Sequence, residues 1–328
     1  MSDVPPPNRK RLPEELPPVE PPSAKFIVQL FLVPGVIVMG IVMVWLLINK
    51  LASTEQDWRA LVRGIENTNE HERWRSAFGL AQLLQADQSA APGEVKLVNN
   101  TEVAGKLAEM LHKELQQPAK GDNSVDQRAF LARTLGMFQT PETVLPTLGE
   151  ALASSQDREV RKNALGAIAV VAGRELEKGS PLKTSKTLDQ VIEISAESDP
   201  LFKQMGAYTL GLFDDPAATK RLGTLMNDDD RNTRANAVAA LVRKGDMSAL
   251  PAVETLLTSV QQTSADSKEP HADFLVAKNM IEALSRLAPK LSAAQKGEVI
   301  KIVEPVATKH ADTRIRLDAE KLLITLKK

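Results

Sequence analysis

Cysteine is absent from this chain, and aromatic residues are scarce. The 328 residues include no cysteine, while phenylalanine, tryptophan and tyrosine together make up 4%. Without cysteine the protein has no thiol nucleophile, no disulfide and no zinc site built from thiolates. The same absence suits an envelope compartment and the cytosol equally well, so it does not decide the location of the protein.

Sequence signals for β-structure are also missing. No run of alternating β-branched residues indicates a strand. Alanine and leucine dominate the periodic segments, and these residues suit closely stacked helices better than a sandwich or a barrel. We therefore predict an all-α protein.

The motifs that mark catalytic and metal sites are not found. The chain has no G-x-S-x-G, G-x-x-x-x-G-K or G-x-G-x-x-G sequence, so serine hydrolysis and nucleotide binding lack support. No histidine begins an H-E-x-x-H motif, and no two are spaced i, i+4; the four are His71, His112, His271 and His310. The acidic run 228–230 lacks the alternating acids and glycine of an EF-hand. We predict no enzyme, no cofactor and no metal site.

The charge balance argues against nucleic-acid binding. Residues 49–328 carry 37 Lys and Arg against 38 Asp and Glu. A protein that grips nucleic acid needs an excess of bases to neutralise phosphates. A nucleic-acid-binding function therefore stays only as an alternative.

A degenerate repeat predicts the architecture. Counting from an aspartate at position zero, it has an apolar residue at +3, a base at +4, a small residue at +7 and a large aliphatic residue at +11. Five copies, the fourth of them weaker, begin 42, 31, 43 and 39 residues apart, at Asp157, Asp199, Asp230, Asp273 and Asp312. Such spacings are typical of stacked helical hairpins. Two partial copies raise the expected number to about seven hairpins: Trp74-Arg75 with Phe78 and Ala81, and Gln127-Arg128 with Leu131 and Leu135-Gly136.

Each repeat position has a physical role. The aspartate is expected to cap a helix N-terminus. Positions +3, +7 and +11 share one helical face and should be buried, with the small residue at +7 allowing a neighbouring helix to approach. The +4 base lies one turn from the aspartate, and we expect it to pair with the repeat aspartates rather than to form a free positive ladder.

These repeats resemble the HEAT-repeat family, including the short bacterial type similar to phycobilisome-lyase repeats. The resemblance covers roughly residues 53–326 and implies an α-solenoid of about seven hairpins that binds protein partners. Members of such families include lyases, DNA glycosylases and di-iron hydroxylases. A lyase or glycosylase-type enzyme therefore remains an alternative, whereas the single His-Glu pair, His71-Glu72, departs from the hydroxylase pattern.

An uncharged segment precedes the repeats. Residues 26–48 carry no charged side chain, and as a helix they would rise about 34 Å, enough to cross a hydrocarbon core of about 30 Å. We predict a single transmembrane helix, 26–48, after a disordered proline-rich tail, 1–25, and before the solenoid, 49–328. This makes the protein a membrane-anchored scaffold at the cell membrane.

The flanking bases predict the orientation. Four bases precede the segment and three follow closely: Arg9, Lys10, Arg11 and Lys25 against Lys50, Arg59 and Arg63. Because cytoplasmic flanks carry more bases, we expect a cytoplasmic N-terminus and an exoplasmic or periplasmic repeat domain.

The resemblance also predicts a binding face. In this family the second helix of each hairpin usually lines the concave side, so positions +1, +2 and +5 would meet a protein partner, either a membrane complex or an extended peptide. The candidate residues are Arg158, Glu159 and Lys162; Arg231, Asn232 and Ala235; and Thr313, Arg314 and Leu317.

Overall fold

The computed structural model describes residues 24–52, 58–65, 67–88, 97–118, 121–261 and 270–328. The chain divides into two units, residues 1–57 and 58–328. The first contains helix α1, Ala24–Ala52, whose described apolar side chains, such as Val36 and Trp45, are exposed. Most of the predicted proline-rich tail, residues 1–23, lies outside the described residues.

The predicted membrane location is contradicted. Within the described part of the chain, no helix is both long enough and apolar enough to cross a membrane. The anchor, the cell-membrane location and the orientation inferred from it are therefore corrected.

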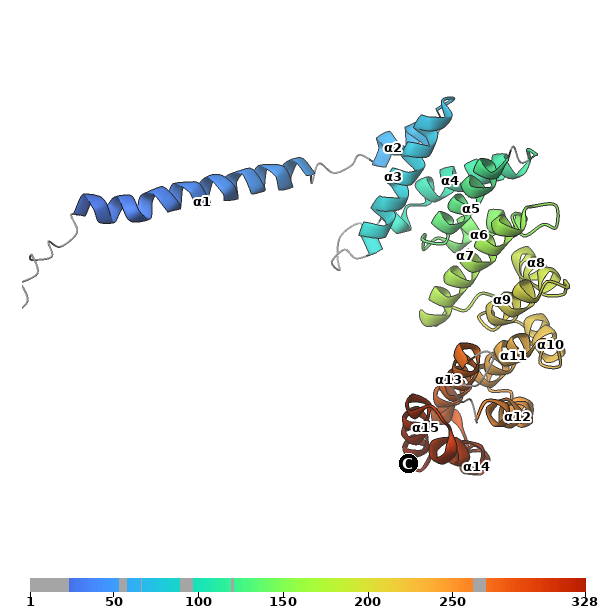
Figure 1. Ribbon diagram of the computed structural model, residues 1–328. Helices are drawn as coiled ribbons and strands as arrows, with labels where there is room; N and C mark the ends of the chain where they lie inside the picture. Colours follow the sequence, from blue (N-terminus) through green and yellow to red (C-terminus); the bar gives the residue numbers. More distant parts are fainter. Residues whose placement is uncertain (1–23, 53–57, 66, 89–96, 119–120, 262–269) are drawn as a thin grey trace, which may run out of the picture. The chain divides into compact units, whose positions relative to one another are not determined.

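The second unit is an array of helical pairs, and its described residues contain helices and turns but no strand. Seven pairs follow one another along the described chain (Figure 1): α2 and α3, Trp58–Ile65 and Glu70–Gln88; α4 and α5, Thr101–Leu115 and Asp122–Leu135; α6 and α7, Pro141–Glu150 and Arg158–Glu177; α8 and α9, Lys186–Ile194 and Pro200–Leu210; α10 and α11, Pro216–Leu225 and Arg231–Lys244; α12 and α13, Leu250–Val260 and Pro270–Leu287; α14 and α15, Ala293–Lys309 and Thr313–Leu326. The all-α solenoid prediction is confirmed.

Second helices pack on second helices along this array. Helix α5 packs on α7, α7 on α9, α9 on α11, α11 on α13 and α13 on α15, while first helices such as α4, α6 and α8 form the other layer. Each pair thus contributes one helix to each layer.

Aspartate caps begin most of these second helices. The side chain of Asp157 accepts from the N–H of Glu159, and Asp199 and Asp312 accept in the same way from the residues two positions on. Asp230 accepts from the N–H of Thr233. Asp273 is the exception because α13 begins at Pro270, which places this aspartate inside the helix, where it is buried.

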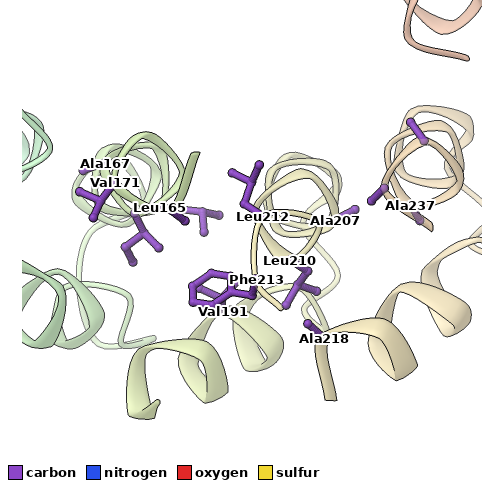
Figure 2. Packing of buried hydrophobic residues seen from close by; sticks show 14 of the residues in the cluster. Leu165, Ala167, Val171, Val191, Ala207, Leu210, Leu212, Phe213, Ala218 and Ala237 are labelled. Carbon is purple, nitrogen blue, oxygen red and sulfur yellow. The ribbon is translucent and has the colours of Figure 1, made fainter. Parts of the chain in front are cut away.

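The repeat stripe forms the core. Positions +3, +7 and +11 are buried in all five copies, apart from the partly buried Leu323 in the last. Figure 2 shows the middle of the array, where Leu165 and Val171 of α7 and Leu210 and Phe213 at the end of α9 belong to one cluster with Val191 of α8. This continuous core joins each pair to the next, as expected of a repeat array.

The first copy has a different register from the one predicted. Phe78, expected in the core, is 55% exposed, whereas Ala77, Leu80 and Leu84 are buried. The cap is Asn69, whose Oδ1 accepts from the N–H of His71 at 3.0 Å. Counting from Asn69 places the small residue Ser76 at +7 and Leu80 at +11, so the copy begins two residues earlier.

The +4 bases do not pair with the capping aspartates. Arg161 pairs with Glu197 and Lys203 with Asp228, in each case an acid two residues before the next repeat's aspartate. Arg234 and Arg316 instead donate to main-chain carbonyls in the turn before their own helix. The +4 position therefore fixes the turns between helices, and the prediction of pairing with the repeat aspartates is wrong.

Candidate functional site

The predicted +1 bases join neighbouring repeats. Nε of Arg158 lies 2.6 Å from Oδ2 of Asp199, and Nη1 of Arg231 lies 2.6 Å from Oδ1 of Asp273. Both acids are the zero-position aspartates of the next repeat. The hydrogen bond from Arg158 is the main reason that the pKa of Asp199 is lowered. These two arginines therefore hold consecutive second helices in register.

The neighbouring +2 and +5 residues of α7 pair with each other. Nζ of Lys162 lies 2.7 Å from Oε2 of Glu159, and Asn163 donates to the other carboxylate oxygen at 2.8 Å. The Lys162 hydrogen bond is the largest cause of the lowered pKa of Glu159. Both side chains remain partly exposed, so they lie at the surface as a local ion pair.

The remaining predicted residues do not extend this surface uniformly. Ala235 is buried, and Asn232 is half-buried. Arg314 pairs with Asp312 of its own repeat at 2.7 Å and lies 4.1 Å from the centre of the Phe274 ring. Thr313 and Leu317 are exposed at the end of the array. The nine predicted residues are therefore not brought together into one site.

A groove opens further along the second helices. It crosses α7, α9 and α11, has a volume of about 440 Å³ and is lined by Gly166, Ala169, Val170, Gln204, Met205, Tyr208, Thr209 and Asn236. Val170 is 52% exposed and Tyr208 is 48% exposed. We call these eight residues the second-helix groove.

Small residues leave room beside Tyr208, the single tyrosine of the chain. Repeat position +9 carries Tyr208 on α9 but Gly166 on α7 and Ala239 on α11. The ring thus stands between two helices that lack a large side chain at the same position. A partner chain can approach the backbone closely at such places.

Polar contacts hold the lining of the groove. Nε2 of Gln204 donates to the capping Asp230 at 3.0 Å, and Nδ2 of Asn236 donates to the main-chain oxygen of Gln204 at 3.0 Å. The hydroxyl of Thr209 donates to the Met205 carbonyl. These bonds orient the side chains before any ligand arrives.

An aromatic cluster lies on the second helices of the first two pairs. The ring centres of Trp74 and Phe130 are 6.0 Å apart in an edge-to-face arrangement, and those of Phe78 and Phe130 are 6.3 Å apart and stacked. Phe78 occupies position +9 when the first copy is counted from Asn69. Position +9 therefore carries an exposed aromatic side chain on α3, Phe78, and again on α9, Tyr208.

The described residues offer few groups for chemistry. Among them, no set of three or more His, Asp or Glu side chains is placed to hold a metal ion. Nδ1 of His112 lies 2.6 Å from Oε2 of Glu150 at the surface. His310 is buried, and this burial lowers its pKa. The second-helix groove itself is apolar with neutral amide and hydroxyl groups, which suits binding.

The predicted binding face, at positions +1, +2 and +5, does not include the residues of this groove. Positions +2 and +9 are seven residues apart, about two helical turns, so they share a face. Extending the predicted face from +2 to +9 would have selected Gly166 and Tyr208. The sequence feature that indicates the groove is the single tyrosine, Tyr208, at a repeat position where the neighbouring second helices carry glycine or alanine.

Comparison with known proteins supports the repeat class. Residues 188–266 match the family model for HEAT repeats. This segment runs from within α8 to beyond the end of α12 and includes five of the eight residues of the second-helix groove. The match agrees with the stacked helical pairs of the structure, which form a helical repeat fold of the HEAT type in this segment.

Solved structures of helical repeat proteins are also similar to this chain. A designed armadillo repeat protein shares 18% identity over 75% of this chain and 99% of its own, with a TM-score of 0.38. The CpcE–CpcF complex of phycocyanin lyase from Nostoc shares 12% over 82% and 94%, with a TM-score of 0.43. Human deoxyhypusine hydroxylase shares 16% over 85% and 98%, with a TM-score of 0.32. No curated protein matches the sequence.

Proposed function

We propose that this protein is a non-catalytic scaffold that binds a protein partner along its second helices. The observation that carries the proposal is the second-helix groove, where Val170 and Tyr208 are each about half exposed on a rigid stack of helices. Exposed aliphatic and aromatic side chains beside small residues are the usual anchors of a protein–protein contact.

The architecture supports this proposal. A helical repeat array has an extended surface made of the same position on successive helices. Here the ion pairs Arg158–Asp199 and Arg231–Asp273 hold α7 on α9 and α11 on α13. The groove lies on α7, α9 and α11, so these contacts help to hold its walls and leave Val170 and Tyr208 exposed to a partner.

Site-specific photocrosslinking in cells of the source organism tests the proposal. A photoreactive phenylalanine analogue replaces Val170 or Tyr208 in the full chain, and the crosslinked products are separated by mass. We expect the same protein to be crosslinked from both positions, because both side chains line one groove. Val170→Asp should abolish the crosslink from position 208 by placing a charge in the apolar contact.

The matched control is Thr224, an exposed residue on the first helix α10. The analogue at this position should not crosslink the partner found from positions 170 and 208. Equal crosslinking from all three positions, or none from 170 and 208, would show that the second helices are not the binding face.

A further inference from the structure

Arg243 lies beside the second-helix groove on α11. The Cβ that a side chain at Gly211 would carry lies 3.1 Å from Nη2 of Arg243 and 3.2 Å from the carbonyl oxygen of Tyr208. The guanidinium group therefore reaches from α11 to the end of α9, one turn beyond the tyrosine. Tyr208, which lines the groove, is close enough to this guanidinium group to interact with it electrostatically.

This guanidinium group has an unmet donor. Among the described residues, the buried Nη2 of Arg243 has no hydrogen-bond partner. Leaving a buried charged donor without an acceptor is costly, so such groups are normally paired. The described residues therefore leave part of the charge and of the hydrogen-bonding capacity of Arg243 unused.

Neighbouring bases show that Arg243 is not needed to cap the preceding helix. Lys244 donates to the carbonyl of Phe213, in the turn after α9. Arg174 makes a similar contact two joints earlier, to the carbonyl of Phe138 in the turn after α5. Because Lys244 already donates to the turn after α9, Arg243 is an additional base at this joint.

The local charges leave Arg243 incompletely compensated. Burial is the main reason that its pKa is lowered, and the nearby Arg286 lowers it further. Glu282 is the nearby acid, but its Oε1 lies 2.7 Å from Nη2 of Arg286. A carboxylate from outside would make the charge-assisted, two-pronged contact for which a guanidinium group is shaped.

We propose that the second-helix groove binds a partner segment in which an apolar side chain is close to an aspartate or glutamate. The apolar side chain packs on Val170 and Tyr208, and the carboxylate pairs with Arg243. This inference rests on the proposed protein-binding function and adds the chemistry of the partner. The acidic side chain gives selectivity, since an amide in its place cannot compensate the positive charge of Arg243.

A displayed library of random linear peptides, selected on the full chain, tests the inference. Enriched peptides are made with amidated ends, and their affinities are measured by fluorescence anisotropy. We expect an apolar residue near an Asp or Glu, and a loss of about 10- to 100-fold in affinity when that acid becomes the amide. Arg243→Gln should remove this discrimination between acid and amide peptides, while the helix content stays unchanged.

Arg286→Gln is the matched control, because this arginine is already paired and its side chain is 65% exposed. It should keep the preference for the acidic peptide. If Arg243→Gln keeps that preference too, or if binding needs a free peptide C-terminus instead, the assignment to an acidic side chain is overturned. A library that yields no binder overturns it as well.

Val170→Asp separates this inference from the proposed function. If Val170→Asp abolishes binding but acid and amide peptides bind equally well, the groove remains the binding face and Arg243 is not part of it. Binding that neither Val170→Asp nor Arg243→Gln changes contradicts both proposals.

Discussion

Two glycine-to-alanine substitutions should have opposite effects on stability. Gly206 occupies the small +7 position on α9, and a Cβ there would lie 2.6 Å from Cβ and 3.1 Å from Cα of Ser195. Gly223 lies on α10, where a Cβ would meet no atom within 4 Å. The chemical change is the same, so the difference reports on packing alone.

The magnitude follows from two terms. Alanine is favoured over glycine inside a helix by about 1 kcal/mol, which benefits both variants. At position 206 the extra methyl group must push α9 away from the turn after α8, and overpacking of this kind costs about 1–3 kcal/mol. We expect Gly206→Ala to lower the free energy of unfolding by up to about 2 kcal/mol and Gly223→Ala to raise it by about 1 kcal/mol.

Thermal unfolding followed by circular dichroism measures both variants against the parent chain. Each 1 kcal/mol should shift the midpoint by about 2–4 °C. Hydrogen exchange in α8 and α9 localises the effect, because a repeat array transmits a defect mainly to its neighbours. A Gly206→Ala protein at least as stable as Gly223→Ala would refute the close packing of α9 on Ser195.

Two further predictions concern the charges of the repeat. Charge reversal at Arg231 should lower the thermal midpoint more than reversal at Arg158, because the partner Asp273 side chain is 8% exposed and that of Asp199 is 25% exposed; equal midpoints in the two single variants would contradict this ranking. Because the +1 arginines are expected to affect stability, a loss of partner binding in these variants has to be compared with their loss of folded protein. The hydrogen bond from Arg314 is the main reason that the pKa of Asp312 is lowered from 3.8 to about 2. The ionised carboxylate of Asp312 therefore stabilises α15 fully above about pH 4, and this stabilisation is lost as the pH falls toward 2. Asp312→Asn keeps a capping side chain and should remove this acid-dependent step from an acid titration of exchange protection in α15; an unchanged titration would exclude Asp312 as its source.

Much of the fold could be predicted from local sequence. A capping aspartate and apolar residues at +3, +7 and +11 act within one helix, and their spacing is visible without a neighbour. These positions are buried as predicted in the five copies, apart from the partly buried Leu323. The first copy was misread because Phe78 looks like a core residue, and only the packing of α3 shows that it is exposed and stacked near Phe130.

The surface could be predicted only in part. Helical geometry placed Glu159 and Lys162 at the surface, but the partners of Arg158 and Arg231 lie 41 and 42 residues further along the chain. Which base meets which acid depends on how two helices stack, and the repeat alone does not specify it. The same is true of Arg161, which pairs with Glu197 rather than with a capping aspartate.

The amino-acid sequence by itself determined that this chain forms helices, where most of them begin, and which stripe of each is buried, because these depend on interactions within a few turns. The tertiary structure decided which arginines join the repeats, that Tyr208 stands between small residues, and that Arg243 reaches the end of α9. Those contacts connect residues on different helices, so they exist only once the helices are stacked.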